Sequence, residues 1–174
     1  VVNAIQMTRL RIRLKTRISD DLLVRMESDH VCRICFDDAR DEQLISPCPC
    51  RGSRAHIHYS CMRAFYETRA RWEDLCCPEC KHTYGGQAAC DLGELGLARV
   101  EQEHGRDHRA VAITLNSLGN AYGDLGDALR QRDLLERALA IQEHEFGRDH
   151  RVVASTLTSL STAYGDLGDA PRQR

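Results

Sequence analysis

The sequence contains eight potential metal ligands arranged as four closely spaced pairs. Seven are cysteines and one is a histidine, at Cys32 and Cys35, Cys48 and Cys50, His58 and Cys61, and Cys77 and Cys80. Zinc prefers thiolate and imidazole ligands and takes four of them in a tetrahedron at structural sites. Each pair supplies half of such a site, so the four pairs predict two zinc ions. Spacing alone does not say which pairs share an ion.

The distribution of cysteines favours metal over disulfides. Of nine cysteines, eight lie between Cys32 and Cys80, and only Cys90 lies outside. Disulfide scaffolds are typical of secreted chains with signal peptides. The N-terminus has no signal-like layout and reads as the cut end of a longer chain. We therefore expect a reducing compartment, the cytoplasm or nucleus.

Three further residues compete for roles near these pairs. Cys76 adjoins Cys77 and is an alternative ligand or a catalytic thiol, but no activating histidine is evident in the sequence. His56 is an alternative to His58, two residues away. Cys90 is expected to be a plain thiol. The sequence thus predicts no catalytic nucleophile.

Composition excludes several classes of protein. The chain has 174 residues and a formal net charge of −2, which argues against a general nucleic-acid binder. Hydrophobic residues make up 42% and aromatic residues 5%, so a core must be aliphatic. No apolar run approaches the roughly 20 residues of a membrane-spanning helix.

The N-terminal segment, residues 1–29, is basic and periodic. Cations alternate with mostly apolar residues from Arg9 to Ile18, which predicts a strand, and Asp20–Met26 predicts a short helix. A stripe of cations suits an anionic surface, but more often belongs to the solvated side of an edge strand.

The C-terminal part of the chain is an internal repeat with a period of 42 residues. Gly105–Arg109 recurs as Gly147–Arg151, and Ala121–Asp127 recurs as Ala163–Asp169. Such periods indicate stacked helical units. Within one unit, one apolar helix face is formed by Val111, Leu115, Leu118, Tyr122 and Leu125, and a second by Leu134, Leu135, Ala138, Leu139 and Ile141. His108 and His150 recur with the repeat, which favours helix caps over metal ligands.

The repeat resembles the tetratricopeptide repeats of kinesin-light-chain-like proteins over about residues 95–174. Leu118-Gly119, Tyr122, Gly126, Leu135 and Ala138-Leu139 carry the resemblance, and a HEAT-like repeat is the alternative. Gln131 replaces the small residue usual early in the second helix. The resemblance implies a surface that holds a protein substrate or adaptor.

The ligand pairs and their flanks resemble the RING-CH (RINGv) zinc finger of ubiquitin ligases. Three segments carry the resemblance: Cys32–Cys35, Leu44–Ser53 and His58–Cys61. Chromatin-reading PHD fingers share the ligand order but have a wider second pair and an aromatic residue where this chain has Leu75. The resemblance implies a cross-brace, in which Cys32, Cys35, His58 and Cys61 hold one zinc ion and Cys48, Cys50, Cys77 and Cys80 hold the other.

The same resemblance implies a function. A ligase of this type binds a ubiquitin-conjugating enzyme charged with ubiquitin, and holds the thioester in a reactive pose. The positions that match the family's docking surface are Ile34, Phe65 and Pro78, and Lys81 matches the cation that bridges enzyme and ubiquitin. Many RING-CH ligases carry membrane helices after the zinc module, whereas repeats follow here. The alternative is a non-catalytic scaffold in which zinc only fixes a binding surface.

We therefore predict a small zinc-stapled α+β RING-like cross-brace module followed by an all-α tetratricopeptide solenoid fragment. The N-terminal segment (1–29) precedes the zinc module (30–85), and a joint with a degenerate repeat helix follows (86–104). One repeat unit (105–146) and a truncated unit (147–174) complete the chain. Gly85-Gly86-Gln87 marks the joint.

Overall fold

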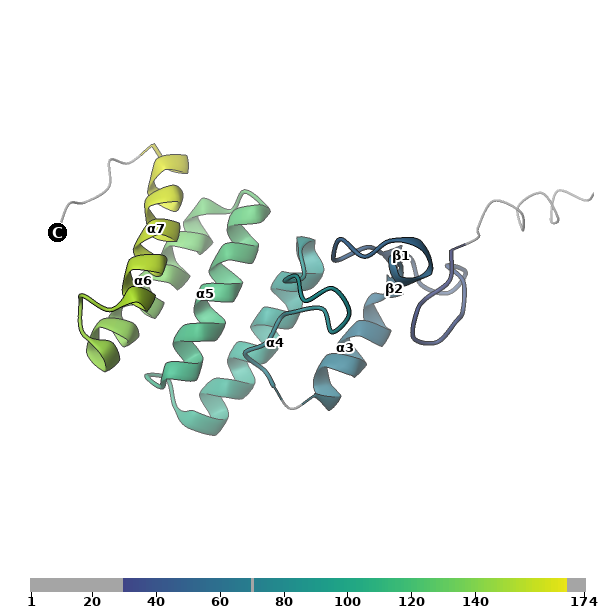
Figure 1. Ribbon diagram of the computed structural model, residues 1–174, viewed down its shortest axis with the longest axis horizontal. Helices are drawn as coiled ribbons and strands as arrows, with labels where there is room; N and C mark the ends of the chain where they lie inside the picture. The colour runs from purple at the N-terminus through teal and green to yellow at the C-terminus, as the bar shows by residue number, and fades with distance from the viewer. Residues whose placement is uncertain (1–29, 70, 169–174) are drawn as a thin grey trace, which may run out of the picture.

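The structure is a computed structural model that describes residues 30–69 and 71–168. The strand and helix predicted within residues 1–29 lie outside these ranges. Figure 1 shows a small module of loops, a short sheet and one helix at one end, followed by a row of four longer helices. This arrangement confirms the predicted fold class.

Short elements hold the ligand pairs of the N-terminal module in place. Strand β1 (Leu44–Ile45) pairs antiparallel with β2 (Ile57–His58), with Leu44 opposite His58. Between them lies a 3₁₀ turn, η1 (Gly52–Arg54). Helix α3 (Tyr59–Thr68) begins directly after β2. The His58–Cys61 pair therefore straddles a strand end and the first turn of a helix.

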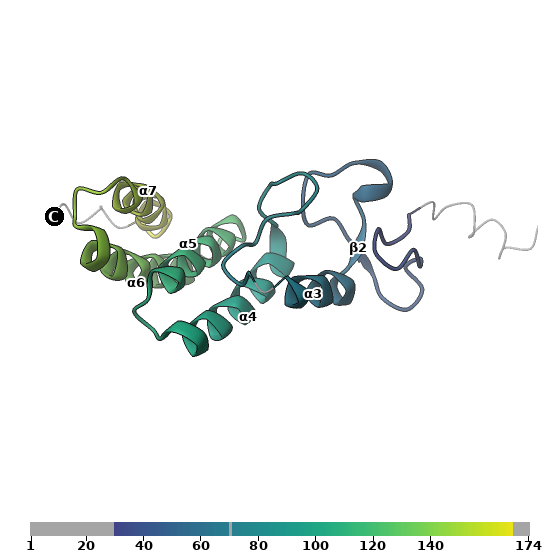
Figure 2. The same ribbon diagram turned by 60° about the horizontal axis from the view of Figure 1, so that its bottom comes forward.

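The repeat region forms four helices that lie side by side in both views (Figures 1 and 2). They are α4 (Gly86–His104), α5 (Arg109–Asp124), α6 (Ala128–Phe146) and α7 (Arg151–Asp166). Each packs mainly against its neighbours along the chain, as stacked helical repeats do. Among the described residues, no helix combines the length and apolarity needed to cross a bilayer.

Histidine side chains begin two of these helices. The Nδ1 atom of His108 accepts a hydrogen bond from the backbone N–H of Ala110 at 3.2 Å, and His150 does the same with Val152 at 3.2 Å. A free N–H at a helix start is satisfied in each case. The prediction that these histidines are caps is confirmed.

The structure shows how Gln131 is accommodated in the repeat and places Leu125 differently from the prediction. Gln131 is 5% exposed and packs closely on α5, because the small residue stands on the opposite helix: a Cβ atom at Gly123 would lie 2.6 Å from the Gln131 side chain. Leu125, expected in the apolar face of α5, is 45% exposed. It lies at the C-cap, where the chain leaves the helix.

The zinc module and the first repeat helices share one apolar core. Tyr66 of α3 and Leu75 are buried in the same cluster as Ala89 and Leu92 of α4 and Leu118 of α5. The joint at Gly85 is therefore a boundary in the sequence but not in the packing. The backbone N–H of Gly85 also donates to the carbonyl of Pro47 at 2.7 Å.

Glycines on α4 allow this close contact. A Cβ atom at Gly96 would lie 2.5 Å from the carbonyl oxygen of Trp72 and would also overlap the hydroxyl of Tyr66. That hydroxyl donates to the same Trp72 carbonyl, and the two rings meet edge to face at 5.5 Å. Arg99 of α4 lies over the indole of Trp72 at 5.6 Å.

Candidate metal centre

The eight ligands are brought together in two groups of four. Cys32, Cys35, His58 and Cys61 form the first group, and Cys48, Cys50, Cys77 and Cys80 form the second. Within each group all ligand atoms lie within 4.8 Å of one another. The first and third pairs of the sequence thus share one group, and the second and fourth share the other.

The separations fit a tetrahedral zinc ion. Zinc–sulfur bonds of about 2.3 Å place the sulfurs of a tetrahedron about 3.8 Å apart. The Sγ atoms of Cys50 and Cys77 are 3.9 Å apart. In the first group, His58 Nδ1 lies 3.3 Å from Cys35 Sγ and 4.0 Å from Cys61 Sγ. The two clusters are therefore suited to two zinc ions.

His58, rather than His56, faces the first cluster, and its tautomer is fixed. Its Nε2 atom lies 2.9 Å from the backbone carbonyl of Asp38, to which it donates. Nδ1 is then left unprotonated toward the sulfurs, which is the usual support for a metal-binding histidine. His56 instead lies against His30, with the ring centroids 4.0 Å apart and the rings tilted by 31°, and its Nδ1 lies 3.3 Å from the hydroxyl of Ser46.

Backbone amides stabilise one thiolate in each cluster. Burial by itself raises the pKa of Cys32, but the N–H groups of Cys35, His58 and Ile34 lower it to about 7. Burial likewise raises the pKa of Cys77, but the N–H groups of Cys80 and Glu79 lower it to about 6. Each cluster thus has an anionic ligand near neutral pH before metal enters.

Neighbouring sulfurs have the opposite effect on other thiols. The N–H of Asp37 lowers the pKa of Cys35, but burial and the sulfurs of Cys32 and Cys61 outweigh it and raise the pKa to about 12. Burial and the neighbouring sulfurs raise the pKa of Cys50 to about 12. These protons leave when the thiols bind metal as thiolates.

Zinc affinity is accordingly expected to rise with pH. Because Cys35 and Cys50 are protonated at neutral pH without metal, each cluster releases at least one proton on binding. Each released proton weakens zinc binding about tenfold for every pH unit lost between pH 8 and 6. Competition with a zinc-binding dye at several pH values measures this slope. An affinity that stays flat over this range would contradict the assignment of the thiols as ligands.

A cation supports the second cluster. An Arg33 guanidinium nitrogen lies 3.9 Å from Cys48 Sγ, and the same nitrogen donates to the carbonyl of Arg54 at 2.9 Å. Burial lowers the pKa of Arg33, but Cys48 and the nearby charge of Cys77 outweigh it and raise the pKa. Four thiolates around one zinc carry excess negative charge, which Arg33 offsets.

The remaining cysteines do not join either cluster. Cys76 lies beside Asp74, whose carboxylate accepts the Cys76 backbone N–H at 2.9 Å. Burial and this carboxylate raise the pKa of Cys76, which opposes a reactive thiolate. Cys90 is fully buried in the shared core, and burial raises its pKa to about 11. Neither thiol has the environment of an activated nucleophile.

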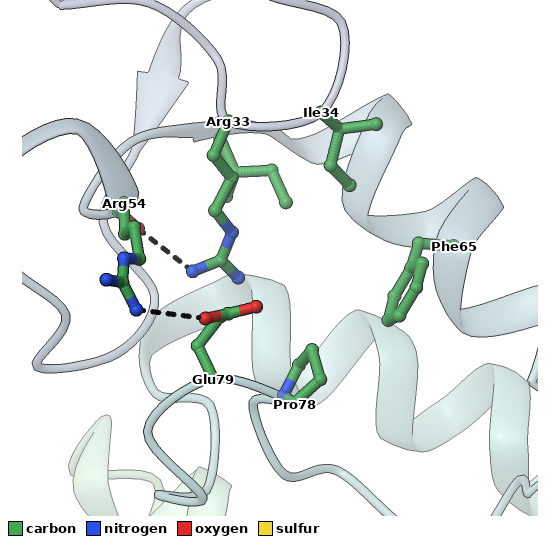
Figure 3. Close-up of a pocket in the computed structure, with 7 residues that line it drawn as sticks. Arg33, Ile34, Arg54, Phe65, Pro78 and Glu79 are labelled. Atoms are coloured by element: carbon green, nitrogen blue, oxygen red, sulfur yellow. Dashed lines mark hydrogen bonds and ion pairs between the residues drawn. The ribbon is translucent and has the colours of Figure 1, made fainter.

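A pocket of about 420 Å³ lies between the two metal-binding turns. Figure 3 shows Ile34 from the first turn, Phe65 from α3 and Pro78 from the second turn around it. Ile34 is 39% exposed and Phe65 36% exposed, so this apolar surface is accessible.

Lys81 lies outside the residues that line the pocket. Its ammonium group donates to the carbonyl of Pro78 at 2.7 Å, so it closes the second turn. Lys81 also has a positive φ of 64°, a backbone conformation that is uncommon outside glycine.

Sequence reasoning missed the polar side of the pocket. Arg33, Arg54 and Glu79 line it opposite the apolar residues, and Arg54 forms an ion pair with Glu79 at 3.2 Å (Figure 3). Arg33 and Glu79 are direct sequence neighbours of Ile34 and Pro78. Their positions next to the predicted docking residues could have indicated that they line the same pocket.

Two interleaved four-ligand clusters on a short sheet and helix, fused to stacked helical pairs, define a cross-brace zinc module joined to a repeat array. Residues 32–80 match the RING-variant domain, and residues 111–151 match the tetratricopeptide repeat. The chain therefore contains a RING-variant domain followed by tetratricopeptide repeat helices.

Several curated proteins are similar to part of this chain. The chain is 38% identical over 90 residues to the E3 ubiquitin-protein ligase MARCHF11 of Rattus norvegicus, covering 51% of this chain and 21% of the relative. It is 29% identical over 72 residues to MARCHF5 of Xenopus laevis, covering 38% and 25%, and 34% identical over 58 residues to human MARCHF8, covering 33% and 19%. The chain thus spans a quarter or less of the length of these relatives.

Proposed function

We propose that this chain is the conjugating-enzyme-binding part of a RING-type ubiquitin ligase. The RING-variant match and the relatives named E3 ubiquitin-protein ligases support the proposal. The observation that carries it is the exposed apolar pocket formed by Ile34, Phe65 and Pro78 between the two metal clusters. A ubiquitin-conjugating enzyme would bind there with its ubiquitin thioester.

The chemistry requires no nucleophile from this chain. Zinc, when bound, fixes the two turns in place. The ligase then acts by holding the thioester and an incoming amine in a productive orientation, which raises the effective concentration of the reacting groups. The raised pKa of Cys76 and Cys90 agrees with a mechanism that forms no thioester on this chain.

The polar side of the pocket would orient the conjugating enzyme. Arg33 presents a planar, permanently charged group, which suits bidentate contact with a carboxylate or carbonyl. The Arg54–Glu79 ion pair borders the same pocket. Lys81, held on the carbonyl of Pro78, is our candidate for the cation near ubiquitin.

Ile34→Ala is expected to reduce ubiquitin chain formation about tenfold without loss of zinc. The change removes an exposed apolar anchor from the centre of the pocket, and such anchors contribute about 1–2 kcal/mol to binding. The assay combines activating enzyme, a panel of conjugating enzymes and ubiquitin with the purified protein. Native mass spectrometry of the same sample reports zinc.

Ile113→Ala is the matched control, since Ile113 of α5 is 42% exposed but lies in the repeats. It should leave chain formation unchanged. If the zinc-loaded wild-type protein formed no chains with any conjugating enzyme, the ligase proposal would fail. A non-catalytic zinc-stabilised scaffold would then be the better description.

The repeat helices would recruit a protein substrate or adaptor. The tetratricopeptide match supports this role, because stacked helical pairs present extended surfaces for protein segments. The shared core at α4 would hold the recruited protein at a fixed position relative to the zinc module.

A further inference from the structure

The basic residues of this protein are almost all arginine. Of its 24 lysine and arginine residues, 22 are arginine, and the two lysines are Lys15 and Lys81. The sequence from residue 82 to residue 174, which holds the whole repeat region, contains ten arginines and no lysine. Lysine and arginine carry the same charge but differ in shape and in chemistry. The choice between them is therefore informative wherever the structure needs only a positive charge.

Some arginines make contacts that a lysine could not make. Arg69, at the C-cap of α3, donates from one terminal nitrogen to the Asp74 carboxylate at 2.6 Å and from the other to the Cys76 carbonyl at 3.1 Å. Its side chain is only 18% exposed. A lysine ammonium is a compact point charge and lacks this planar fork. Geometry by itself explains arginine at such a position.

Other arginines lie on the surface and need no such fork. Arg63 of α3 meets Glu67 one turn later on the same helix at 3.0 Å, and its side chain is 53% exposed. Arg148, between α6 and α7, lies 3.9 Å from Glu143 and its side chain is 79% exposed. Exposed pairs of this kind contribute little to stability, and a lysine forms them as well as an arginine does. The contacts therefore do not account for arginine at these positions.

The two side chains differ in what they can do to a ubiquitin thioester. A deprotonated lysine amine attacks the thioester carbonyl, and a C–N bond forms as the C–S bond breaks. The thiolate of the conjugating enzyme leaves, and the amine gives its extra proton to solvent. The guanidinium of arginine stays protonated and has no free lone pair, so it cannot take ubiquitin in this way. Arginine thus supplies a positive charge without supplying an acceptor.

The one lysine among the described residues is Lys81, which lies outside the repeats. Its ammonium group donates to the carbonyl of Pro78 at 2.7 Å, within the second metal-binding turn. This hydrogen bond must break before the amine can react. The repeat helices therefore present positive charge through arginine alone.

A lysine on the repeats would compete for ubiquitin, because the repeats are fixed to the zinc module. Tyr66 and Leu75 of the zinc module are buried in one cluster with Ala89 and Leu92 of α4. An amine tethered near a reacting group has an effective concentration on the order of millimolar where the geometry allows contact. Such an amine would take ubiquitin that could otherwise pass to a bound protein.

We propose that the arginine-only basic surface of the repeats keeps ubiquitin off the ligase's own repeat arm and leaves it for a lysine of a bound protein. The inference rests on the proposed ligase function and identifies the acceptor of that reaction. It also explains why arginine stands at exposed sites where a lysine would satisfy every contact.

Charge-preserving substitutions test this proposal. A variant with Arg109→Lys, Arg148→Lys and Arg151→Lys places three amines on the repeats, all at exposed positions. Zinc-loaded protein is incubated with activating enzyme, a conjugating enzyme and ubiquitin. Ubiquitin on the chain itself should rise several-fold over the wild-type level, and peptide mass spectrometry should locate it on the new lysines. Glutamine at the same three positions is the matched control, because it removes the guanidinium groups without adding amines, and should leave self-modification unchanged.

Discharge of the charged conjugating enzyme onto free lysine separates this inference from the proposed function. The wild-type protein should accelerate this discharge, and the triple lysine variant should send less ubiquitin to free lysine because its own amines compete. A wild-type protein that did not accelerate discharge would overturn the ligase function and this inference with it. Accelerated discharge with no ubiquitin on the introduced lysines would overturn the inference alone, because the repeats would then lie out of reach of the thioester.

Discussion

Cys77→Ser is expected to remove zinc from the second cluster and unfold the zinc module. Cys77 is fully buried and supplies one of four ligands. A structural zinc site contributes about 10–16 kcal/mol coupled to folding, which matches or exceeds the whole stability of a typical domain. Serine cannot replace the thiolate. Native mass spectrometry should show fewer than two zinc ions.

The loss should spread beyond the zinc module. Cys77 belongs to the same buried cluster as Leu75, Tyr84 and Ala89. Unfolding of the zinc module should therefore expose the side of α4 that packs against it. Trp72, the single tryptophan of the chain, lies at this junction and reports it. Its fluorescence should shift to the red in Cys77→Ser and after treatment of the wild-type protein with a strong chelator.

Cys76→Ser is the matched control for this experiment. Cys76 is the direct neighbour of Cys77, but it lies outside both ligand groups. The variant should retain two zinc ions and the wild-type tryptophan spectrum. A Cys77→Ser protein that kept two ions and its fold, or a Cys76→Ser protein that lost one, would refute the ligand assignment.

Gly96→Leu is expected to lower stability by about 3 kcal/mol in the presence of zinc. Overpacking a tight contact costs about 1–3 kcal/mol or more, and here the obstacle includes the backbone carbonyl of Trp72, 2.5 Å from the first added atom. Helix α4 would have to move away from Tyr66 and Trp72. Chemical denaturation followed by tryptophan fluorescence measures the change.

Gly165→Leu provides the control at a glycine with open surroundings. A Cβ atom at Gly165 of α7 would meet no atom within 4 Å. Leucine has the higher helix propensity, so this variant should gain up to about 0.8 kcal/mol. Equal stability of the two leucine variants would show that α4 does not pack tightly on the zinc module.

The Gly96→Leu variant also tests whether α4 holds the repeats in place relative to the zinc module. If α4 fixes the repeats relative to the zinc module, Gly96→Leu should retain two zinc ions but loosen that placement. The ligands lie on other elements, β2, α3 and the loops around them, so their spacing does not depend on Gly96.

Much of this protein was predictable from its sequence because the determinants are local or periodic. Two ligands with one or two residues between them form half of a zinc site whatever the rest of the chain does, and the residues around Cys32 and Cys48 carried the RING-CH resemblance. The 42-residue period specified the helical pairs and the capping histidines. Turn geometry and helix periodicity need only neighbouring residues.

Other features needed residues that are distant in the sequence. Gly96 was not singled out, because its role depends on Tyr66 and Trp72, which lie at least 24 positions away. The support that Arg33 gives to the second cluster was not predicted, because Arg33 and Cys48 lie 15 positions apart in the sequence and come together only in the folded protein.

The sequence by itself determined the four ligand pairs, which predict two zinc ions, and the repeating helices. Both depend on the type and spacing of residues that lie close together in the chain. Only the tertiary structure decided that the two parts share a core and that the pocket has a charged side. Those properties arise from which surfaces exclude water from each other, and that depends on every element packed nearby.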